Sequence, residues 1–207
     1  GDGLIAGPRP WPIQVAGLAD VVTIAAGRAH TCAVLALGRV YCWGLNQGGA
    51  LGDGTTDDRT LPVEVVGLSG ATSVTAAGED VASGEDFSCA LVDDGGVHCW
   101  GAGVRGALGS GSEWTSSNVP VLVDGFSPAA YLGPAASGHV CAIRADGSTL
   151  CWGAGGSGQL GTDLWTTEIW WTSLVPLTVD GLEGVATISA GYEHSCATLV
   201  DGTAYCW

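Results

Sequence analysis

The sequence predicts an all-β protein, a β-propeller of four-stranded antiparallel blades with about four repeat units. A Cys-Trp pair recurs with its cysteine at positions 42, 99, 151 and 206, so successive repeats are 57, 52 and 55 residues long. Apolar and polar residues alternate within each unit, and glycine and Asp-Gly pairs interrupt the alternation, which is typical of strands joined by turns. No stretch keeps the period of about 3.6 residues that a helix needs. Units of this length with about four short strands are characteristic of propeller blades.

Each unit contains the same elements in the same order. A strand-like segment such as VVTIAAG (residues 21–27) leads to a hairpin that carries two cysteines. A glycine-rich stretch ending in Leu-Gly follows three of the four tryptophans, and then come a loop and an alternating apolar run such as LPVEVVGL (residues 61–68). These segments together supply the four expected strands.

We expect one propeller region over residues 1–207, with units at about 1–44, 45–101, 102–153 and 154–207. The first unit is partial, because the opening Gly-Asp-Gly matches residues 52–54 and residues 10–18 match LPVEVVGL. The last unit stops at Trp207, before its glycine-rich stretch. This pattern favours a segment of a larger ring over a closed four-bladed ring.

The cysteines form four pairs with a constant separation of ten residues. A hairpin loop of three or five residues makes the two members of a pair directly opposed, at a Cα separation of ~4.5 Å that a disulfide can bridge. Structural zinc usually takes cysteines two to four residues apart in sets of four, so disulfides are favoured over a metal clip or free thiols. Disulfides predict an oxidising compartment, extracellular or at the cell surface. The pairs are Cys32 with Cys42, Cys89 with Cys99, Cys141 with Cys151, and Cys196 with Cys206.

The charge of the chain excludes several classes of partner. The formal net charge is -15, from 21 acidic and 6 basic residues, so the chain repels nucleic-acid phosphates and anionic membranes. No apolar run approaches the ~18 residues of a membrane span. Lysine is absent and no nucleophile, metalloprotease or phosphate-loop motif occurs, so we expect neither an enzyme nor a cofactor. Protein partners, self-association and carbohydrate binding remain.

A variable loop is the strongest lead to a binding site. Between the Leu-Gly pair and the next proline the sequence grows from DGTTDDRTL to SGSEWTSSNV to TDLWTTEIWWTSLV. Loops display binding residues, and clustered tryptophans anchor protein interfaces, although packing on a neighbouring blade is an equal alternative. The tryptophans of this loop are Trp114, Trp165, Trp170 and Trp171. A weaker candidate is a calcium site at Asp53, Asp57 and Asp58, where Asp-Gly is also ordinary turn chemistry.

Histidine and tryptophan recur around the cysteine pairs. Phe87 replaces histidine in the second unit, which argues for packing rather than a ring of metal ligands. The tryptophans directly follow a cysteine and therefore face the other side of the strand, where we expect them in the core between blades. The residues with this expected structural role are His30, His139, His194, Trp43, Trp100, Trp152 and Trp207.

The stretch from His30 to Gly52 reads His-Thr-Cys-Ala-x-Leu, then Gly-x-Val-Tyr-Cys-Trp-Gly-x-Asn-x-x-Gly-x-Leu-Gly. It resembles the regulator of chromosome condensation repeat, and most closely its bacterial, cysteine-bearing, alpha-tubulin suppressor-like branch. The resemblance implies rings of commonly seven blades and a structural histidine. Members of the family include a nucleotide-exchange factor, secreted β-lactamase inhibitors and surface proteins.

We therefore expect a secreted or surface-displayed propeller that serves as a protein-interaction or structural module, such as part of an adhesin, fibre or coat. The alternative is a secreted inhibitor of a partner enzyme. A propeller-based lyase or glycosidase is the third possibility.

Overall fold

The computed structural model describes residues 10–78, 85–112, 116–126, 128–164 and 171–207. Antiparallel strands make up most of this part of the chain. They are β1 (Val21–Ala26), β2 (His30–Leu35), β3 (Val40–Gly44), β4 (Arg59–Glu64), β5 (Ala71–Ala77), β6 (Phe87–Val92), β7 (Val97–Gly101), β8 (Ser117–Leu122), β9 (Ala129–Leu132), β10 (His139–Arg144), β11 (Thr149–Ala154), β12 (Thr172–Thr178), β13 (Val185–Ala190), β14 (Ser195–Leu199) and β15 (Ala204–Cys206). Two short 3-10 helices, η1 (Gln47–Gly49) and η2 (Val104–Gly106), follow the third strand of the first two sheets.

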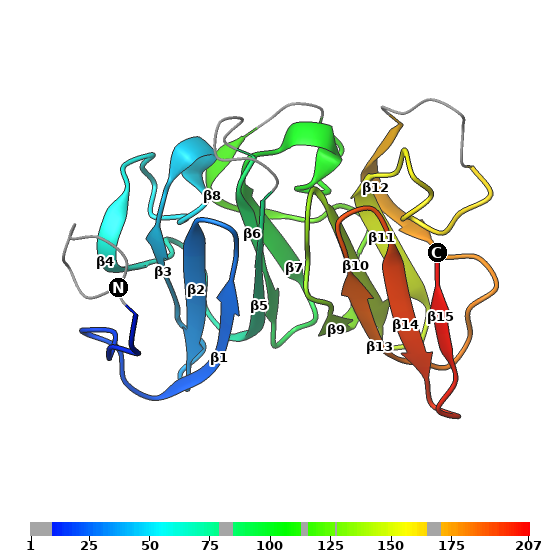
Figure 1. The fold of residues 1–207 in the computed structure, drawn as a ribbon, viewed down its shortest axis with the longest axis horizontal. Coiled ribbons are helices and arrows are strands. Elements are labelled where there is room, and N and C mark those ends of the chain that lie inside the picture. The colour runs from blue at the N-terminus through cyan, green and yellow to red at the C-terminus, as the bar shows by residue number, and fades with distance from the viewer. Residues whose placement is uncertain (1–9, 79–84, 113–115, 127, 165–170) are drawn as a thin grey trace.

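The strands form four sheets that follow one another in a row (Figure 1). Strands β1–β4, β5–β8 and β9–β12 each make a four-stranded antiparallel sheet, and β13–β15 make a sheet that has three strands within the described residues. Consecutive strands are neighbours throughout. The predicted all-β architecture of propeller blades is therefore confirmed, and each repeat unit that begins at residue 45, 102 or 154 spans parts of two sheets.

The cysteine hairpins have the predicted register. Cys32 lies opposite Cys42, and Val34 opposite Val40, which leaves a five-residue loop centred on residue 37. The same pairing of cysteines occurs in the other three hairpins. All four pairs are disulfide-bonded, with Cα atoms 4.0–4.1 Å apart, and no described cysteine is free.

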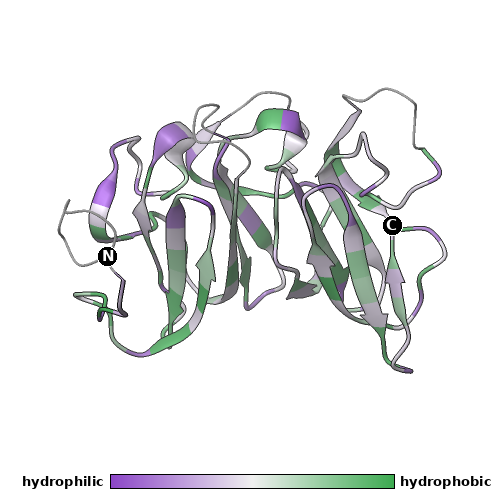
Figure 2. Cartoon of the chain, in the orientation of Figure 1, coloured by the Kyte–Doolittle hydropathy of each residue, from purple (hydrophilic) through white to green (hydrophobic). Residues whose placement is uncertain are grey.

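The core lies between successive sheets and not within one. We call these three interfaces junction 1 (β1–β4 with β5–β8), junction 2 (β5–β8 with β9–β12) and junction 3 (β9–β12 with β13–β15). Each contains one cluster of buried apolar residues drawn from both of its sheets. Apolar residues accordingly concentrate on the strands (Figure 2). Every inner sheet is thus held from both sides.

The up-and-down order of the strands gives each sheet two different ends. The connections between first and second strands and between third and fourth strands lie at one end, together with η1 and η2; we call this the loop face (Figure 1). The cysteine-hairpin turns and the links between sheets lie at the opposite end, the turn face. In the part of the chain that is described, no helix is long and apolar enough to span a membrane.

Candidate functional site

A tryptophan closes each junction. The indole Nε1 donates a hydrogen bond to a backbone carbonyl in the glycine-rich stretch of the preceding blade. The pairs are Trp100 with Ala50 (2.9 Å), Trp152 with Ala107 (3.0 Å) and Trp207 with Gln159 (3.0 Å). Trp43 has the same position in the first blade and is buried. Trp100, Trp152 and Trp207 therefore lie between two blades, where an aromatic ring needs a partner for its N–H.

The glycine of each Leu-Gly pair lies under the tryptophan of the next blade. Gly109 has a φ of +61°, and a Cβ there would lie 2.9 Å from Trp152 Nε1. Gly52 and Gly161 have equivalent positions beneath Trp100 and Trp207. The repeated glycine thus satisfies two requirements, a left-handed backbone and the close approach of a ring.

At junction 1 a histidine and a serine form a second contact between blades. His30 Nε2 lies 2.8 Å from Ser88 Oγ, and Ser88 Oγ donates to the Ala50 carbonyl over 3.0 Å. Because the single hydroxyl proton is used in that bond, the imidazole must donate from Nε2. Ser88 of the second blade is therefore held between a donor and an acceptor of the first. We call this three-group contact the clamp.

Junction 3 repeats the clamp and junction 2 replaces it. His139 Nε2 lies 2.9 Å from Ser195 Oγ, which donates to the Gln159 carbonyl over 2.9 Å. At junction 2 the corresponding residues are Phe87 and Val140, both fully buried in one apolar cluster. Where the histidine is lost, the serine opposite it is lost too. The sequence alone did not lead us to this serine position, although a signal was present. The residue directly before the first cysteine of each hairpin is apolar only at Val140, which is also where the histidine of the preceding blade is replaced by Phe87; the other three are Thr31, Ser88 and Ser195.

The clamp at junction 1 resembles a nucleophilic triad in composition but not in chemistry. His30 Nδ1 lies 4.0 Å from Asp86 Oδ1, so a serine, a histidine and an aspartate stand in line. Ser88 and His30 are both buried, and the serine proton is committed to a carbonyl. Burial lowers the pKa of His30 to about 4, against a smaller raising effect of a hydrogen bond to the Phe87 backbone, which makes the imidazole a weak base. The arrangement holds two blades together and activates no nucleophile.

The third-to-fourth-strand loop of the first blade is organised by Asn46. This fully buried side chain accepts from Leu51 N (2.9 Å) and donates to the Asp57 carbonyl (3.0 Å). Its backbone N–H donates to Asp58 Oδ1 (2.8 Å). The other repeats have Gly103 and Gly155 at this position, so the repeat pattern alone did not indicate this role.

The aspartates proposed for calcium are engaged within the same loop or exposed. Arg59 makes an ion pair with Asp53 at 2.8 Å, and Thr55 donates to the same carboxylate. Burial would raise the pKa of Asp53, but the hydrogen bonds from Thr55 and Arg59 outweigh it and lower the pKa. Asp57 and Asp58 are exposed. The described residues contain no group of three or more His, Cys, Asp or Glu side chains placed to hold a metal ion.

The third blade anchors its loop differently. Trp171 packs half-buried against the junction 3 cluster, and its carbonyl accepts from Gly155 N over 2.9 Å. A Cβ on Gly155 would lie 2.3 Å from the Trp171 ring, so glycine at this position makes room for the indole. The other three tryptophans of the variable loops, Trp114, Trp165 and Trp170, lie outside the described residues.

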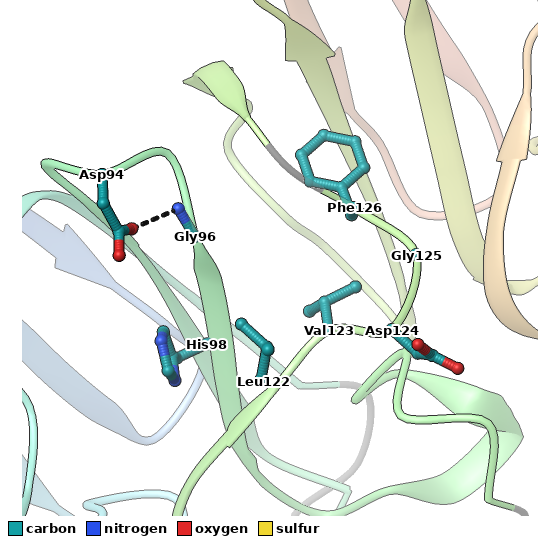
Figure 3. A pocket seen from close by; sticks show the side chains of 8 residues that line it. All are labelled: Asp94, Gly96, His98, Leu122, Val123, Asp124, Gly125 and Phe126. Carbon is teal, nitrogen blue, oxygen red and sulfur yellow. Dashed lines mark hydrogen bonds between the residues drawn. The ribbon is translucent and has the colours of Figure 1, made fainter.

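The turn face holds an open pocket of about 580 Å³ on the second blade (Figure 3). His98 on β7 lies beside Leu122, and Phe126 and Asp124 form the other side. Asp94 Oδ1 is occupied by the Gly96 N–H at 2.8 Å. Burial lowers the pKa of His98 and Asp94 opposes this shift. The lining offers apolar surface and scattered charges but no paired acid and base.

The innermost strands border a second hollow. Residues of β1, β5 and β9 line a groove of about 350 Å³, with Ile24, Val74 and Leu132 among them. Its walls are mostly small and apolar, which suits packing and peptide contact better than chemistry.

Each blade is cross-linked by a disulfide, and neighbouring blades are joined by a tryptophan contact and by a second contact that is polar at junctions 1 and 3 and apolar at junction 2. These features define a β-propeller built from sequence repeats. Two sequence models of the regulator of chromosome condensation (RCC1) repeat match the chain, one at residues 38–91, 94–143 and 146–198 and the other at 21–50 and 79–107. Because the first match alone covers more than half of the chain, the chain belongs to the RCC1 repeat family.

Similar proteins share this architecture over part of their length. The chain is 32% identical to the ultraviolet-B receptor UVR8 of Arabidopsis thaliana over 90% of the chain and 41% of the receptor. It is 30% identical to the E3 ubiquitin-protein ligase HERC2 of Homo sapiens over 90% of the chain and 4% of that protein. Among solved structures, yeast RCC1 (Prp20) bound to Kap60 matches with a TM-score of 0.75 at 21% identity, over 93% of the chain and 45% of that chain. Human WBSCR16 matches with 0.71 at 26% identity, over 90% and 47%. The chain thus spans less than half of each of these proteins.

Proposed function

We propose that the chain is a protein-interaction module of a secreted or surface protein, such as an adhesin, fibre or coat component, and that it binds through its loop face. The supporting observation is a contrast between framework and loops. The tryptophan contact, the Leu-Gly glycine and the disulfide recur at every junction, whereas the third-to-fourth-strand loops differ in length and anchor.

Two loops show how this contrast arises. The first blade holds its loop with polar contacts from Asn46, Asp53 and Arg59, and the third blade holds its loop with Trp171 over Gly155. A constant scaffold with differently built loops at one end is the usual arrangement of binding proteins. The residues with titratable and nucleophilic groups at junction 1 are used for packing, which favours binding over catalysis.

The relatives support a protein as the partner. Yeast RCC1 has been solved bound to Kap60, and Prp20p of Saccharomyces cerevisiae is described by its binding to Gsp1p and histones. The net charge of -15 favours a partner surface that is neutral or basic. Flat tryptophan rings in the variable loops also suit a sugar.

The four disulfides support an oxidising compartment for the chain. Alkylation of the chain taken from its native source, without reductant, should leave all eight cysteines unmodified. Modification of most of them would place the protein in a reducing compartment and remove the secreted part of the proposal.

Binding by the loop face is tested with two matched variants. Trp114→Ala with Trp165→Ala removes two loop indoles, and Leu37→Ala removes an exposed apolar side chain from the turn face. The immobilised chain should retain a partner from the extracellular fraction of its source, and the loop variant should lose it while the Leu37 variant keeps it. Equal loss or equal retention in both variants would contradict the proposal. A single soluble enzyme that is inhibited on binding would select the inhibitor alternative instead.

A further inference from the structure

The first blade holds an arginine on its turn face between an aromatic ring and a carboxylate. The guanidinium of Arg39 lies over the Tyr41 ring, with Cζ 5.4 Å from the ring centroid. Its Nη2 donates to the Tyr41 hydroxyl, and its Nε lies 3.3 Å from Glu64 Oε1. Tyr41 and Glu64 lie opposite each other on β3 and β4. This arrangement combines a cation–π contact with an ion pair.

The pocket on the turn face of the second blade is the equivalent place without its arginine. Gly96 has the position of Arg39 in the repeat. His98 has the position of Tyr41 and lies opposite Leu122 of β8. A space of about 580 Å³ lies open beside these residues (Figure 3). The side chain that covers this place in the first blade is therefore missing from the second.

The backbone does not require glycine at position 96. Gly96 is not among the glycines with a positive φ, and the third and fourth hairpins carry Ser148 and Thr203 at this position. A Cβ on Gly96 would lie 3.6 Å from His98 Nε2, so a side chain there would pass beside the imidazole, as Arg39 passes over its own ring. The glycine thus leaves the ring accessible to a group from outside the chain.

The turn aspartate next to the pocket has an oxygen to spare. Asp146 and Asp201, at the same position of the third and fourth hairpins, each accept both the N–H and the hydroxyl of the residue two positions on, at 2.6–2.9 Å. Among the described residues Asp94 accepts only the Gly96 N–H, through Oδ1. Burial lowers the pKa of His98 and the charge of Asp94 opposes this shift, so the carboxylate and the ring lie near each other.

The rest of the lining suits a cation with an apolar stem. Asp124 is a second exposed carboxylate, and none of the eight lining residues is basic. Arg144 of the third blade lies over Phe126, with Cζ 5.6 Å from the ring centroid, but does not line the pocket. Leu122 is 58% exposed and offers apolar surface to an aliphatic chain. A planar guanidinium fits a ring and a carboxylate better than a compact ammonium does.

We propose that this pocket, lined by Asp94, His98, Leu122 and Asp124, receives an arginine side chain of a partner protein. The guanidinium lies over His98 beside Asp94, and the aliphatic part of the side chain lies on Leu122. The net charge of -15 attracts a basic partner surface toward the chain. This contact is on the turn face, and it does not depend on binding through the loop face.

The chemistry of the site is tested with a blocked amino acid. N-acetyl-arginine amide is titrated into the chain while the histidine ring signals are followed by nuclear magnetic resonance, and the His98→Asn variant assigns the His98 signals. These signals should shift and saturate with a dissociation constant on the order of millimolar. N-acetyl-lysine amide should bind at least about threefold more weakly. No shift of the His98 signals, or equal binding of the two probes, would overturn the proposal.

Matched variants test the position of the site. Asp94→Asn keeps an acceptor for the Gly96 N–H but removes the charge, and it should weaken arginine binding by at least about threefold. Asp146→Asn makes the same change on the third hairpin and should leave the affinity unchanged. Gly96→Arg supplies an internal guanidinium and should abolish the His98 response. Equal affinities of the two asparagine variants, or undiminished binding to the Gly96→Arg chain, would contradict the proposal.

Two further comparisons separate a protein partner from other sources of the signal. Free arginine carries a carboxylate that Asp94 and Asp124 repel, so it should bind more weakly than the blocked form. Tighter binding of free arginine would make the occupant a small molecule and would contradict a protein partner. The Trp114→Ala with Trp165→Ala chain should bind the blocked arginine as tightly as the unchanged chain does. Loss of binding in that variant would place the site on the loop face and overturn the proposal.

Discussion

At the scale of single residues, the junctions depend on pairs rather than on individual side chains. The buried histidine at junction 1 or 3 is tolerated because a serine of the next blade accepts a hydrogen bond from its Nε2 and donates its own hydroxyl hydrogen bond to a carbonyl. An unpaired imidazole in the same place would cost about 1–3 kcal/mol. Junction 2 avoids this cost by using Phe87 and Val140 in place of both polar residues.

The buried histidines predict a loss of stability in mild acid. Burial lowers the pKa of His30 and of His139 from 6.5 to about 4, and a smaller effect of His194 acts in the same direction on His139. Below pH 6.5 these two histidines therefore bind protons in the unfolded chain but remain neutral in the folded chain. The free energy of unfolding should fall by about 3 kcal/mol per histidine as the pH drops from about 6.5 to about 4, and then level off for this contribution.

Denaturant unfolding at several pH values measures this dependence. The variant His30→Phe with Ser88→Val converts junction 1 to the apolar type of junction 2 and should show about half the loss between pH 6.5 and 4. Burial raises the pKa of Asp86, an effect that Arg28 reduces, so Asp86 protonation acts in the opposite direction in both proteins. An unchanged pH dependence in the variant would show that His30 is not responsible.

The glycine beneath each tryptophan gives a second prediction at this scale. Gly109 and Gly125 both have a positive φ, but a Cβ on Gly109 would lie 2.9 Å from Trp152 Nε1 and one on Gly125 would meet nothing within 4 Å. Gly125→Ala should cost about 1–2 kcal/mol from backbone strain alone. Gly109→Ala should cost about 1–3 kcal/mol more, because the ring must move. Equal losses of stability for the two variants in thermal unfolding would mean that the Trp152 ring moves aside at no energetic cost.

At the scale of elements, the hairpin and its disulfide form the unit that repeats. Removing Cys89 and Cys99, both as alanine, should cost about 2–3 kcal/mol from loop entropy and about 1–3 kcal/mol more from the cavity, because both are fully buried. Removing Cys196 and Cys206 opens a loop of the same length but exposes little, since Cys206 is already exposed. The difference between the two variants in the free energy of unfolding, measured with denaturant, gives the contribution of the buried cavity. Equal losses would mean that each disulfide stabilises only by restricting the unfolded chain.

The hairpin is also where sequence reasoning was most successful. The ten-residue spacing, with its central turn, is enough to oppose the cysteines, because register in a hairpin is set by loop length. The loops could not be predicted in this way. Asn46 and Trp171 anchor two loops from unrelated positions, and each depends on contacts that form only after the strands have assembled.

At the scale of the whole molecule, the second and third blades act as adaptors. The second receives a polar contact through Ser88 and presents an apolar one through Phe87, and the third reverses this with Val140 and His139. The blades are therefore not interchangeable, although their sheets have the same topology.

Deleting residues 71–128 tests this ordering. The deletion joins the first blade to the third and places His30 against Val140, so the shortened chain should lose about 1–3 kcal/mol relative to the same deletion that also carries Val140→Ser. Thermal unfolding of the two shortened chains, equal in length, compares only the new junction. A serine that gives no advantage would show that the tryptophan contact alone specifies the neighbour.

The paired residues at the junctions also bear on how such an array can grow. A duplication that copies one blade inserts both of that blade's faces, and copying the second blade alone would place Phe87 of one copy against Ser88 of the other. Copying the second and third blades together would instead bring His139 to the duplicated Ser88 and leave every contact matched. Tandem arrays with this kind of junction should therefore lengthen by blocks of blades whose first and last faces match each other. The unit that is duplicated is then larger than a single blade.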